Sequence, residues 1–408
     1  MVVVRPFEGI RPAEDLADKV ACLPYDVLNS QEAKALAADN PYSFFHIDKA
    51  EIDLPEELSP YDPAVYQKAA ANLQAFLAQG WLKKETAPTM YLYELTMMGR
   101  SQTGLVATTA IDDYVSGKIK KHEFTRPEKE VDRINHIKAC DANTSPIFLS
   151  YRTNNALQEL MANWQTEHSP VYDFDSFHDV NHKVWVIDDT EVVNALTEGF
   201  AEISALYIAD GHHRTESAVK VGLEKRADQT NSPESDYFLS IIFPDDQLAI
   251  WEYNRVLQVP LPSDFFDQLT TAFTVAKSGV KKPAAKGQIQ MYVAHEWYTL
   301  TIKPTILPED VVGSLDVSVL QKQVFEKIFG IMDIRTDKRI DFVGGIRGPK
   351  ELERLVDEDD WNLAFSMYPT RMQDLLDVAD AGEIMPPKST WFEPKLLSGL
   401  FLHDLETR

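Results

Sequence analysis

Cysteine is nearly absent from this sequence, and so are the long apolar segments of membrane proteins. Its two cysteines, Cys22 and Cys140, are too few among 408 residues for a disulfide framework and fit a reducing compartment. No apolar run approaches the length that spans a bilayer. The first residues also lack the basic region and long apolar core of a signal peptide. We therefore expect a cytoplasmic globular protein with no membrane partner.

Positive charge is also scarce. The chain has 40 Lys and Arg against 64 Asp and Glu, which gives a formal net charge of −24. Non-specific binding to nucleic acid depends on Lys and Arg that neutralise phosphates, so this chain would repel a duplex at long range. The densest basic stretch, residues 118–122, is short and has no recognisable helix-turn-helix beside it. We expect no nucleic-acid partner.

The usual signatures of nucleotide enzymes are missing as well. The sequence contains no Walker motif and no protein-kinase set of Lys and Asp-Phe-Gly, which excludes the conventional folds for phosphoryl transfer. The glycine-rich residues 344–348 match no phosphate-binding loop and predict a tight loop.

Residues 206–218 are the most informative stretch. Residues 206–209 predict a short buried strand, Gly211 a sharp turn, and residues 212–225 a helix. Such a turn presents unpaired backbone N–H groups and the positive end of the helix dipole to anions. Arg214 in the first turn is unfavourable without an anionic partner. Together with Asp210, His212 and His213, this pattern predicts a phosphate site with acid–base groups; the alternative is a polar surface turn.

A second junction of the same kind precedes a helix expected over residues 128–140. His122, Glu123 and Thr125 come before the helix start, where a phosphate or a polarised hydroxyl can be held. Asp132, Arg133 and His136 fall on neighbouring turns of the helix. The alternative is a helix that carries surface ion pairs. For Tyr25 and Asp26, a simple turn and a role in the site are both open.

These motifs carry a family resemblance. Gly211-His212-His213-Arg214 resembles the Gly-x-x-Arg box of the ParB/sulfiredoxin superfamily, in which a strand–turn–helix holds nucleotide phosphates. The Asp-Gly-His-His-Arg form resembles the SerK-type free serine kinases. From residues 6–11 to residues 385–390, the chain is similar to an uncharacterised bacterial family of unknown function that is often labelled SpoOJ/ParB-like. That family shows the patterns His-Glu-x-Thr, Asp-Arg and Asn-x-Ser-Pro-Ile-Phe, the last at residues 143–148 here.

The resemblance implies an α+β fold: a ParB/sulfiredoxin-like nucleotide-binding core with mixed α/β elements before and after it. We expect the core with its N-terminal elaboration over residues 1–258. A C-terminal α/β region, residues 259–408, should end in a Pro/Lys-rich clasp, from which Lys388 can alternatively reach an anionic substrate. Apolar spacing predicts helices over residues 30–39, 62–78, 155–167, 190–202 and 317–329, a strand over 42–47, and hairpins over 91–114 and 237–256.

Together these features predict a nucleotide-dependent phosphotransferase, with ATP or ADP as nucleotide and a small amino acid such as serine as acceptor. In this hypothesis the backbone of residues 211–213 cradles the phosphates, Arg214 clamps them, Asp210 holds Mg²⁺, and Glu123 takes the hydroxyl proton. The expected catalytic residues are Glu123, Asp210 and His213. The expected nucleotide ligands are Gly211, His212, His213, Arg214, His122, Thr125 and Arg133.

Two alternatives belong to other classes. One is a nucleotide-binding or nucleotide-hydrolysing regulatory switch without a small-molecule acceptor. The other is a metal-dependent hydrolase with transition-metal ligands among Asp210, His212, His213, His122 and Glu123. Adjacent histidines on a helix point about a third of a turn apart, which makes shared ligation awkward. Sulfiredoxin chemistry is excluded, because it needs a cysteine where His212 stands.

Overall fold

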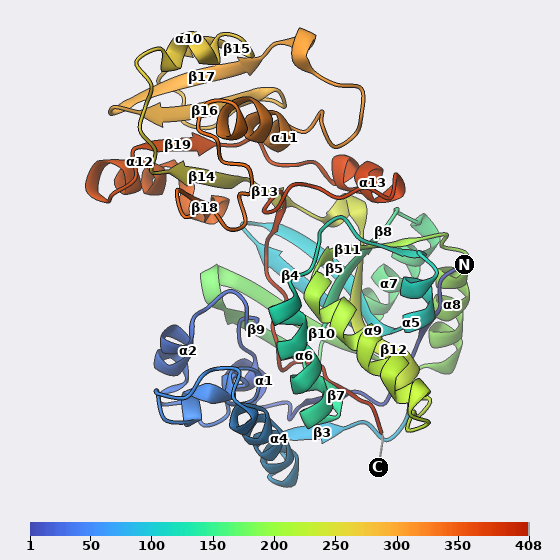
Figure 1. Ribbon diagram of the computed structural model, residues 1–408. Helices are drawn as coiled ribbons and strands as arrows, with labels where there is room; N and C mark the ends of the chain where they lie inside the picture. Colours follow the sequence, from blue (N-terminus) through green and yellow to red (C-terminus); the bar gives the residue numbers. More distant parts are fainter. Residues whose placement is uncertain (407–408) are drawn as a thin grey trace. The chain divides into compact units, whose positions relative to one another are not determined.

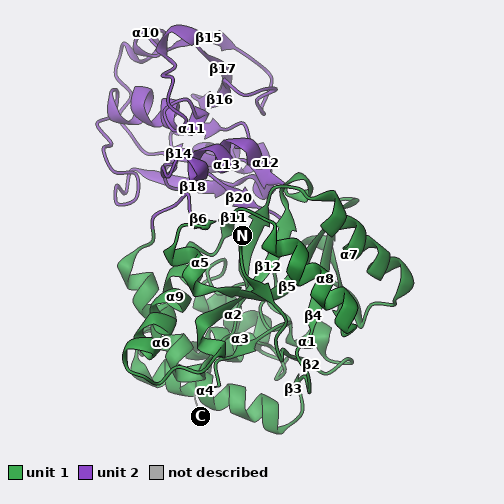
Figure 2. Cartoon of the chain, turned by 90° about the vertical axis from the view of Figure 1, so that its right-hand side faces the viewer, with its two compact units in different colours: residues 1–120, 125–248, 394–408 green, residues 121–124, 249–393 purple. Residues whose placement is uncertain are grey.

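The computed structural model describes residues 1–406 and combines helices with several β-sheets. The chain divides into two compact units, which Figure 2 colours separately. Unit 1 comprises Met1–Lys120, Thr125–Leu248 and Pro394–Arg408, and unit 2 comprises Lys121–Phe124 and Ala249–Glu393. The expected mixture of helices and sheets is confirmed. The predicted domain limits, 1–258 and 259–408, remain a prediction.

Unit 1 is built on a nine-stranded mixed sheet in the order β6-β11-β8-β12-β5-β4-β10-β9, with β1 also beside β5. β11 runs parallel to β6, and β12 runs parallel to β8, whereas the other neighbours are antiparallel. The strands are β1 (Val4–Arg5), β4 (Met90–Met97), β5 (Arg100–Ala110), β6 (Ile119–Lys120), β8 (Ile147–Tyr151), β9 (Tyr172–Ser176), β10 (Val180–Ile187), β11 (Leu206–Asp210) and β12 (Tyr237–Pro244).

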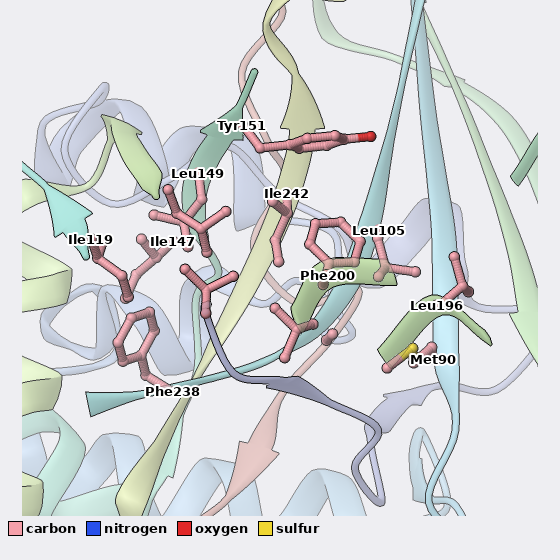
Figure 3. Close-up of a cluster of buried hydrophobic side chains, with 14 of the residues drawn as sticks. Met90, Leu105, Ile119, Ile147, Leu149, Tyr151, Leu196, Phe200, Phe238 and Ile242 are labelled. Atoms are coloured by element: carbon pink, nitrogen blue, oxygen red, sulfur yellow. The ribbon is translucent and has the colours of Figure 1, made fainter. Parts of the chain in front are cut away.

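Helices cover this sheet. In Figure 1, α6 (Pro127–Cys140) and α9 (His212–Ala227) lie side by side, and they pack against each other. α7 (Asn155–Glu167) and α8 (Thr190–Ala201) form a second packed pair. Figure 3 shows how Leu196 and Phe200 of α8 join strand side chains such as Leu105 and Ile242 in one apolar cluster. Each such side chain contributes about 1.5–3 kcal/mol when it leaves water. Within residues 1–406, no helix has both the length and the apolar character needed to cross a membrane.

The N-terminal part of unit 1 adds a smaller helical cluster of α1 (Ala17–Val20), α2 (Ser30–Ala37), α3 (Phe45–Asp48) and α4 (Pro63–Ala78). α4 begins where its sequence signals predict, because Asp62 accepts a hydrogen bond from Ala64 N at 2.9 Å and Pro63 needs no amide partner. Its buried residues Val65, Ala69, Leu73 and Phe76 recur at helical spacing and face this cluster.

Residues 398–404, here called the C-terminal segment, also pack into unit 1. β21 (His403–Asp404) pairs with β7 (Ala142–Asn143), and β2 (Ile10–Pro12) pairs with β3 (Leu82–Lys84). Leu402 exchanges backbone hydrogen bonds with Ile10, and Ser398 does so with Cys22. The C-terminal segment is therefore a fixed part of unit 1.

Unit 2 contains a six-stranded antiparallel sheet in the order β15-β17-β16-β19-β14-β18. Its strands are β14 (Tyr253–Leu257), β15 (Phe273–Lys277), β16 (Gln288–Val293), β17 (Glu296–Ile302), β18 (Ile340–Gly344) and β19 (Leu363–Ser366). The helices are α10 (Phe265–Leu269), α11 (Asp316–Leu320), α12 (Gly348–Glu358) and α13 (Met372–Asp380), and a small ladder joins β13 (Ile250–Trp251) to β20 (Trp391–Phe392).

Several local predictions are wrong. The strand predicted for residues 42–47 is the short helix α3, because burial of Phe45 and Ile47 in the helical cluster outweighs the β preference of the aromatic run. The helix predicted over residues 30–39 is present as α2, but its cap is Asn29 and not Ser30, which the sequence suggests as the capping residue; the Asn29 side chain accepts from Glu32 N at 2.9 Å. The helix predicted over 317–329 is divided into α11 and a π-helical turn, Gln321–Glu326.

The hairpin predicted over residues 237–256 is also wrong. β12 lies in the nine-stranded sheet of unit 1, whereas β14 lies in the six-stranded sheet of unit 2. Two apolar runs separated by a short polar turn are typical of a hairpin, but here each run finds its hydrogen-bond partners in a different sheet.

Candidate functional site

The strand–turn–helix predicted around Gly211 is present. β11 ends at Asp210, Gly211 has a φ of 92°, and α9 begins at His212. Gly211 N donates to Asp210 Oδ1 at 2.7 Å, and the Gly211 carbonyl accepts from the amide and hydroxyl of Thr215 at 2.9 and 3.0 Å. The turn is thus fixed by local hydrogen bonds, with the first amides of α9 following directly.

Arg214 is a buried cation in the first turn of α9. Its Nη1 donates to the carbonyl of Pro146 at 2.6 Å, and its Nη2 lies 3.9 Å from Asp210 Oδ1. Its Nε is buried and has no hydrogen-bond partner among the described residues. Burial opposes the charged form, but the negative charges of Asp26 and Asp210 raise the pKa of Arg214 above its ordinary value. The charged guanidinium therefore keeps an unused donor.

Asp210 has a closer cationic partner than Arg214. The ammonium group of Lys395 lies 3.1 Å from Asp210 Oδ2. Burial alone would raise the pKa of Asp210, but the charges of Lys395 and Arg214 and the Gly211 amide hold it well below its ordinary value. Asp210 is therefore an ionised carboxylate with both oxygens engaged.

Arg133 projects from α6 and is held on three sides. Its guanidinium lies 3.9 Å from the centre of the Tyr25 ring, which is a cation–π contact. Asp132 Oδ2 accepts from Nε and Nη2 at 2.9 Å each, and Nη1 lies 3.6 Å from Asp48 Oδ1. These contacts fix the guanidinium plane.

The two arginines line one pocket of unit 1, although they come from different helices. The pocket is small and open to solvent, and its wall includes Tyr25, Arg133, His136, Thr144, Ser145 and Arg214. Arg133 and Arg214 were both expected ligands, and Tyr25 and the Asn-x-Ser segment contribute to the same wall. A pocket with two cations and several hydroxyl groups is suited to an anionic group.

Asp48 accepts hydrogen bonds from residues of the pocket wall and was not expected from the sequence. Its fully buried carboxylate accepts from the hydroxyl groups of Ser145 and Ser398 at 2.8 Å each and from Thr144 at 3.3 Å. His136 Nε2 lies 3.1 Å from Thr144 Oγ1. Burial, assisted by the positive charge of Arg133, lowers the pKa of His136 to about 3, so this imidazole is neutral near pH 7.

His213 connects the start of α9 with the start of α6, and Thr125 lies just before α6. His213 Nε2 accepts from the backbone N of Arg126, the N-cap of α6, at 3.0 Å. Burial and the charge of Arg126 lower the pKa of His213, in keeping with an accepting nitrogen. The Thr125 hydroxyl donates to the carboxylate of Glu130. His212, the first residue of α9, is buried. Their roles toward a ligand stay predictions.

His122 and Glu123 belong to the short segment Lys121–Phe124, which clusters with unit 2. The His122 carbonyl accepts from Met385 N at 2.9 Å, and its Nε2 lies 3.4 Å from Thr390 Oγ1. The catalytic partnership of Glu123 with Asp210 therefore stays a prediction that variants must test.

Residues 1–406 contain no group of three or more His, Cys, Asp or Glu side chains arranged to hold a metal ion. The transition-metal hydrolase consequently has no ligand cluster in this part of the chain. The assignment of Asp210 to Mg²⁺ needs only one carboxylate and remains a prediction.

The sequence patterns do not identify Asp48, Lys395 or Ser398 as residues near the candidate site. Asp48 follows an aromatic run that carries no recognisable motif. Lys395 closes the Pro-rich segment in which Lys388 was singled out, but Lys388 lies over the Tyr253 ring of unit 2, at 5.4 Å. The backbone pairing of residues 398–404 with the rest of unit 1 brings Lys395 to Asp210. No local sequence pattern predicts that pairing.

Comparison with known proteins gives a family match and several structural similarities. The family model described as "Protein of unknown function (DUF1015)" matches residues 4–318. No curated protein matches the chain.

Solved structures with some similarity include a free serine kinase in complex with AMP, with 11% identity and a TM-score of 0.37 over 71% of this chain and 86% of that chain. C-terminally truncated SbnI from Staphylococcus aureus has 12% identity and a TM-score of 0.39 over 72% and 85%. A conserved hypothetical protein from Pyrococcus furiosus has 13% identity and a TM-score of 0.37 over 73% and 95%.

Proposed function

The chain belongs to the DUF1015 family of proteins of unknown function, and we propose that this member binds the phosphates of ATP or ADP and transfers a phosphoryl group to the hydroxyl of a small amino acid, serine being the first candidate. We also propose that its core is of the ParB/sulfiredoxin type, on the resemblance of the Gly211–Arg214 box. The observation that carries the proposal is the pocket with two buried arginines, one of which keeps an unused donor.

Charge pairing around the pocket favours an anionic ligand. Arg133 is paired with Asp132 and lies near Asp48, and Asp210 is paired with Lys395. Among the described residues, the one carboxylate oxygen within 4 Å of Arg214 is Asp210 Oδ1, at 3.9 Å. Of the charged side chains Arg133, Lys395 and Arg214, Arg214 therefore has the most distant carboxylate partner. A phosphate oxygen at its Nε would supply the missing acceptor and a charge-assisted hydrogen bond.

In the proposed reaction, Arg214 and Arg133 hold phosphate oxygens, with the amides at the start of α9 near His212 and His213. The serine hydroxyl oxygen forms the new bond to phosphorus as the bond from phosphorus to the nucleotide oxygen breaks, and Glu123 takes the hydroxyl proton. The leaving nucleotide keeps the electron pair of the broken bond. Positioned charge supplies most of the acceleration in such transfers.

Binding of Mg²⁺ by Asp210 remains a prediction, and no step of the proposed reaction depends on it. Asp210 already accepts from Gly211 N and from Lys395 Nζ, so a metal would have to displace the ammonium group. Nucleotide binding measured with Mg²⁺ and with EDTA tests this point. Equal affinity in both conditions would remove Asp210 from the metal ligands.

The first experiment measures thermal shifts of the purified chain with ADP, ATP, AMP and CTP, because a ligand that binds the folded state raises its stability by mass action. Arg214→Ala should weaken binding by roughly 1.5–3 kcal/mol, the magnitude of a charge-assisted hydrogen bond. Arg226→Ala is the matched control. Arg226 is on the same helix but pairs with Asp112 and Asp236 instead. Unchanged binding in Arg214→Ala would contradict the site.

The second experiment tests the reaction by detecting phosphoserine after incubation with serine, Mg²⁺ and ADP or ATP. The Glu123→Gln variant should bind nucleotide normally and form far less product. If no phosphoserine forms and both proteins hydrolyse nucleotide equally, the regulatory switch replaces the kinase.

A further inference from the structure

Lys395 is held in unit 1 by the pairing of the segment that follows it. Ser398 and Cys22 exchange backbone hydrogen bonds of 2.9 and 3.1 Å, and Leu402 N donates to Ile10 O at 2.8 Å. The Ser398 hydroxyl also donates to the buried carboxylate of Asp48. In Figure 1 this segment is drawn in dark red, the colour of the highest residue numbers on the bar. Lys395 therefore reaches Asp210 from a fixed backbone, and its side chain is only 14% exposed.

The two oxygens of Asp210 are divided between different partners. Oδ2 accepts from Lys395 Nζ at 3.1 Å, and Oδ1 accepts from Gly211 N at 2.7 Å. Arg214 Nη2 is 3.9 Å from Oδ1, beyond hydrogen-bond distance. Asp210 thus forms its shorter ion pair with Lys395, at 3.1 Å, whereas the guanidinium four residues later forms a longer ion pair of 3.9 Å without a hydrogen bond.

Replacement of Lys395 would change which cation each oxygen of Asp210 contacts. The carboxylate of Asp210 would lose its nearest cation, and Arg214 is the one remaining cation within 4 Å in the described chain. A partly buried carboxylate with only a distant counter-ion is unfavourable, so the guanidinium of Arg214 would be drawn from 3.9 Å into a short, hydrogen-bonded ion pair with Asp210. Its donors would then serve Asp210, and an incoming anion would meet a neutralised site.

We propose that Lys395 is a positioning residue that pairs with Asp210 and so leaves the guanidinium of Arg214 to bind the phosphate groups of the ligand. This inference rests on the proposed anion-binding function and adds the C-terminal segment to it. It assigns Lys395 a role through Asp210 instead of a direct contact with the ligand.

The test is a double-mutant cycle in the full chain, with ADP as the probe and affinity measured by calorimetry. Lys395→Met should weaken ADP binding by roughly tenfold or more, the effect of losing one interaction of about 1.4 kcal/mol. Lys395→Met combined with Asp210→Asn should bind within about threefold of Asp210→Asn alone, because no carboxylate remains to capture Arg214. Lys395→Arg should retain most of the affinity.

Lys84→Met is the matched control. Lys84 also joins the body of unit 1 to the C-terminal segment, through Asp404, and pairs with Glu406, but it contacts neither Asp210 nor the pocket wall. Its replacement should leave ADP affinity unchanged. Denaturant unfolding of every variant shows whether the fold is retained.

The outcomes separate this inference from the function on which it rests. If Lys395→Met weakens ADP binding as much in the Asp210→Asn background as in the wild type, Lys395 acts on the ligand independently of Asp210 and the positioning role is overturned. If Lys395→Met binds like the wild type while Arg214→Ala does not, the inference fails and the anion site stands. If the wild type and Arg214→Ala bind ADP equally, the proposed function itself fails.

Discussion

Gly211 leaves the space in which the guanidinium of Arg214 lies. A Cβ atom at residue 211 would be 3.1 Å from Arg214 Nε, 3.2 Å from Cζ and 3.3 Å from Nη2. The arginine side chain therefore folds back over the turn from which its helix begins. This contact gives the Gly-x-x-Arg spacing a physical reason beyond the backbone freedom of glycine: the missing side chain makes room for the cation.

Gly211→Ala should consequently impair both stability and ligand binding. The φ of 92° strains any residue with a Cβ, at a cost of about 1 kcal/mol, and the new methyl group would displace the guanidinium. Gly80→Ala provides the matched control, since Gly80 also has a positive φ, of 70°, but no atom lies within 4 Å of its added Cβ. Both variants should lose similar stability in denaturant unfolding, while ADP affinity should fall only in Gly211→Ala. Equal affinities would show that the Gly211–Arg214 contact is dispensable.

Asp48→Asn should destabilise unit 1 strongly. The buried carboxylate accepts from Ser145, Ser398 and Thr144 and lies 3.6 Å from Arg133 Nη1. Loss of its charge leaves a buried guanidinium with one counter-ion fewer, which costs about 3–5 kcal/mol in comparable pairs. Ser398→Ala removes the hydrogen bonds of its hydroxyl group to Asp48 and Ser145 but no charge, and should cost about 1–2 kcal/mol. Denaturant unfolding measures the loss of stability in each variant. The loss should be clearly larger in Asp48→Asn than in Ser398→Ala, and equal losses would contradict the argument from charge.

Stability should decrease as the pH falls below neutrality because of two buried histidines. Burial lowers the pKa of His136 and of His182 to about 3 in the folded protein, from an ordinary value of 6.5. Between about pH 3 and 6.5 the unfolded chain therefore binds more protons. Each histidine then lowers the free energy of unfolding by up to about 1.4 kcal/mol per pH unit as the pH falls.

His182→Gln tests the sign of this effect. Unfolding curves from pH 5 to pH 8 should show a shallower pH dependence in the variant than in the wild type. Above about pH 7.5 the two proteins should differ by a constant offset, because both histidines are then neutral in the unfolded chain as well. A steeper dependence in the variant would mean that His182 is charged in the folded protein.

Duplex DNA should not bind specifically at physiological salt, despite the resemblance to ParB-type proteins. The net charge of −24 opposes association with phosphates at long range. A mobility-shift assay with random and palindromic duplexes measures this, with a basic DNA-binding protein as positive control. Tight, sequence-selective binding would overturn the expectation.

Short-range signals explain what could be predicted. The strand–turn–helix at residues 206–225 is encoded by adjacent residues, since an apolar run, a glycine and a helix pattern act within a few turns. The same holds for α4, whose cap and apolar spacing are local. Where tertiary packing competes with local preference, prediction fails: the aromatic run near Phe45 is helical, and the two halves of the expected 237–256 hairpin join different sheets.

The features of the candidate site also fall into those that the local sequence predicts and those that depend on tertiary packing. The sequence by itself determined the box at Gly211, the helix that carries Arg133, and the acidic charge that disfavours DNA, because these depend on composition and neighbouring residues. Only the tertiary structure decided that Arg133 and Arg214 share a pocket, that Asp48 contacts residues of the pocket wall, and that Lys395 pairs with Asp210. These contacts join residues far apart in the chain. Their formation depends on the packing of α6 against α9 and on the pairing of the C-terminal segment, where the energy of many buried contacts outweighs any local preference.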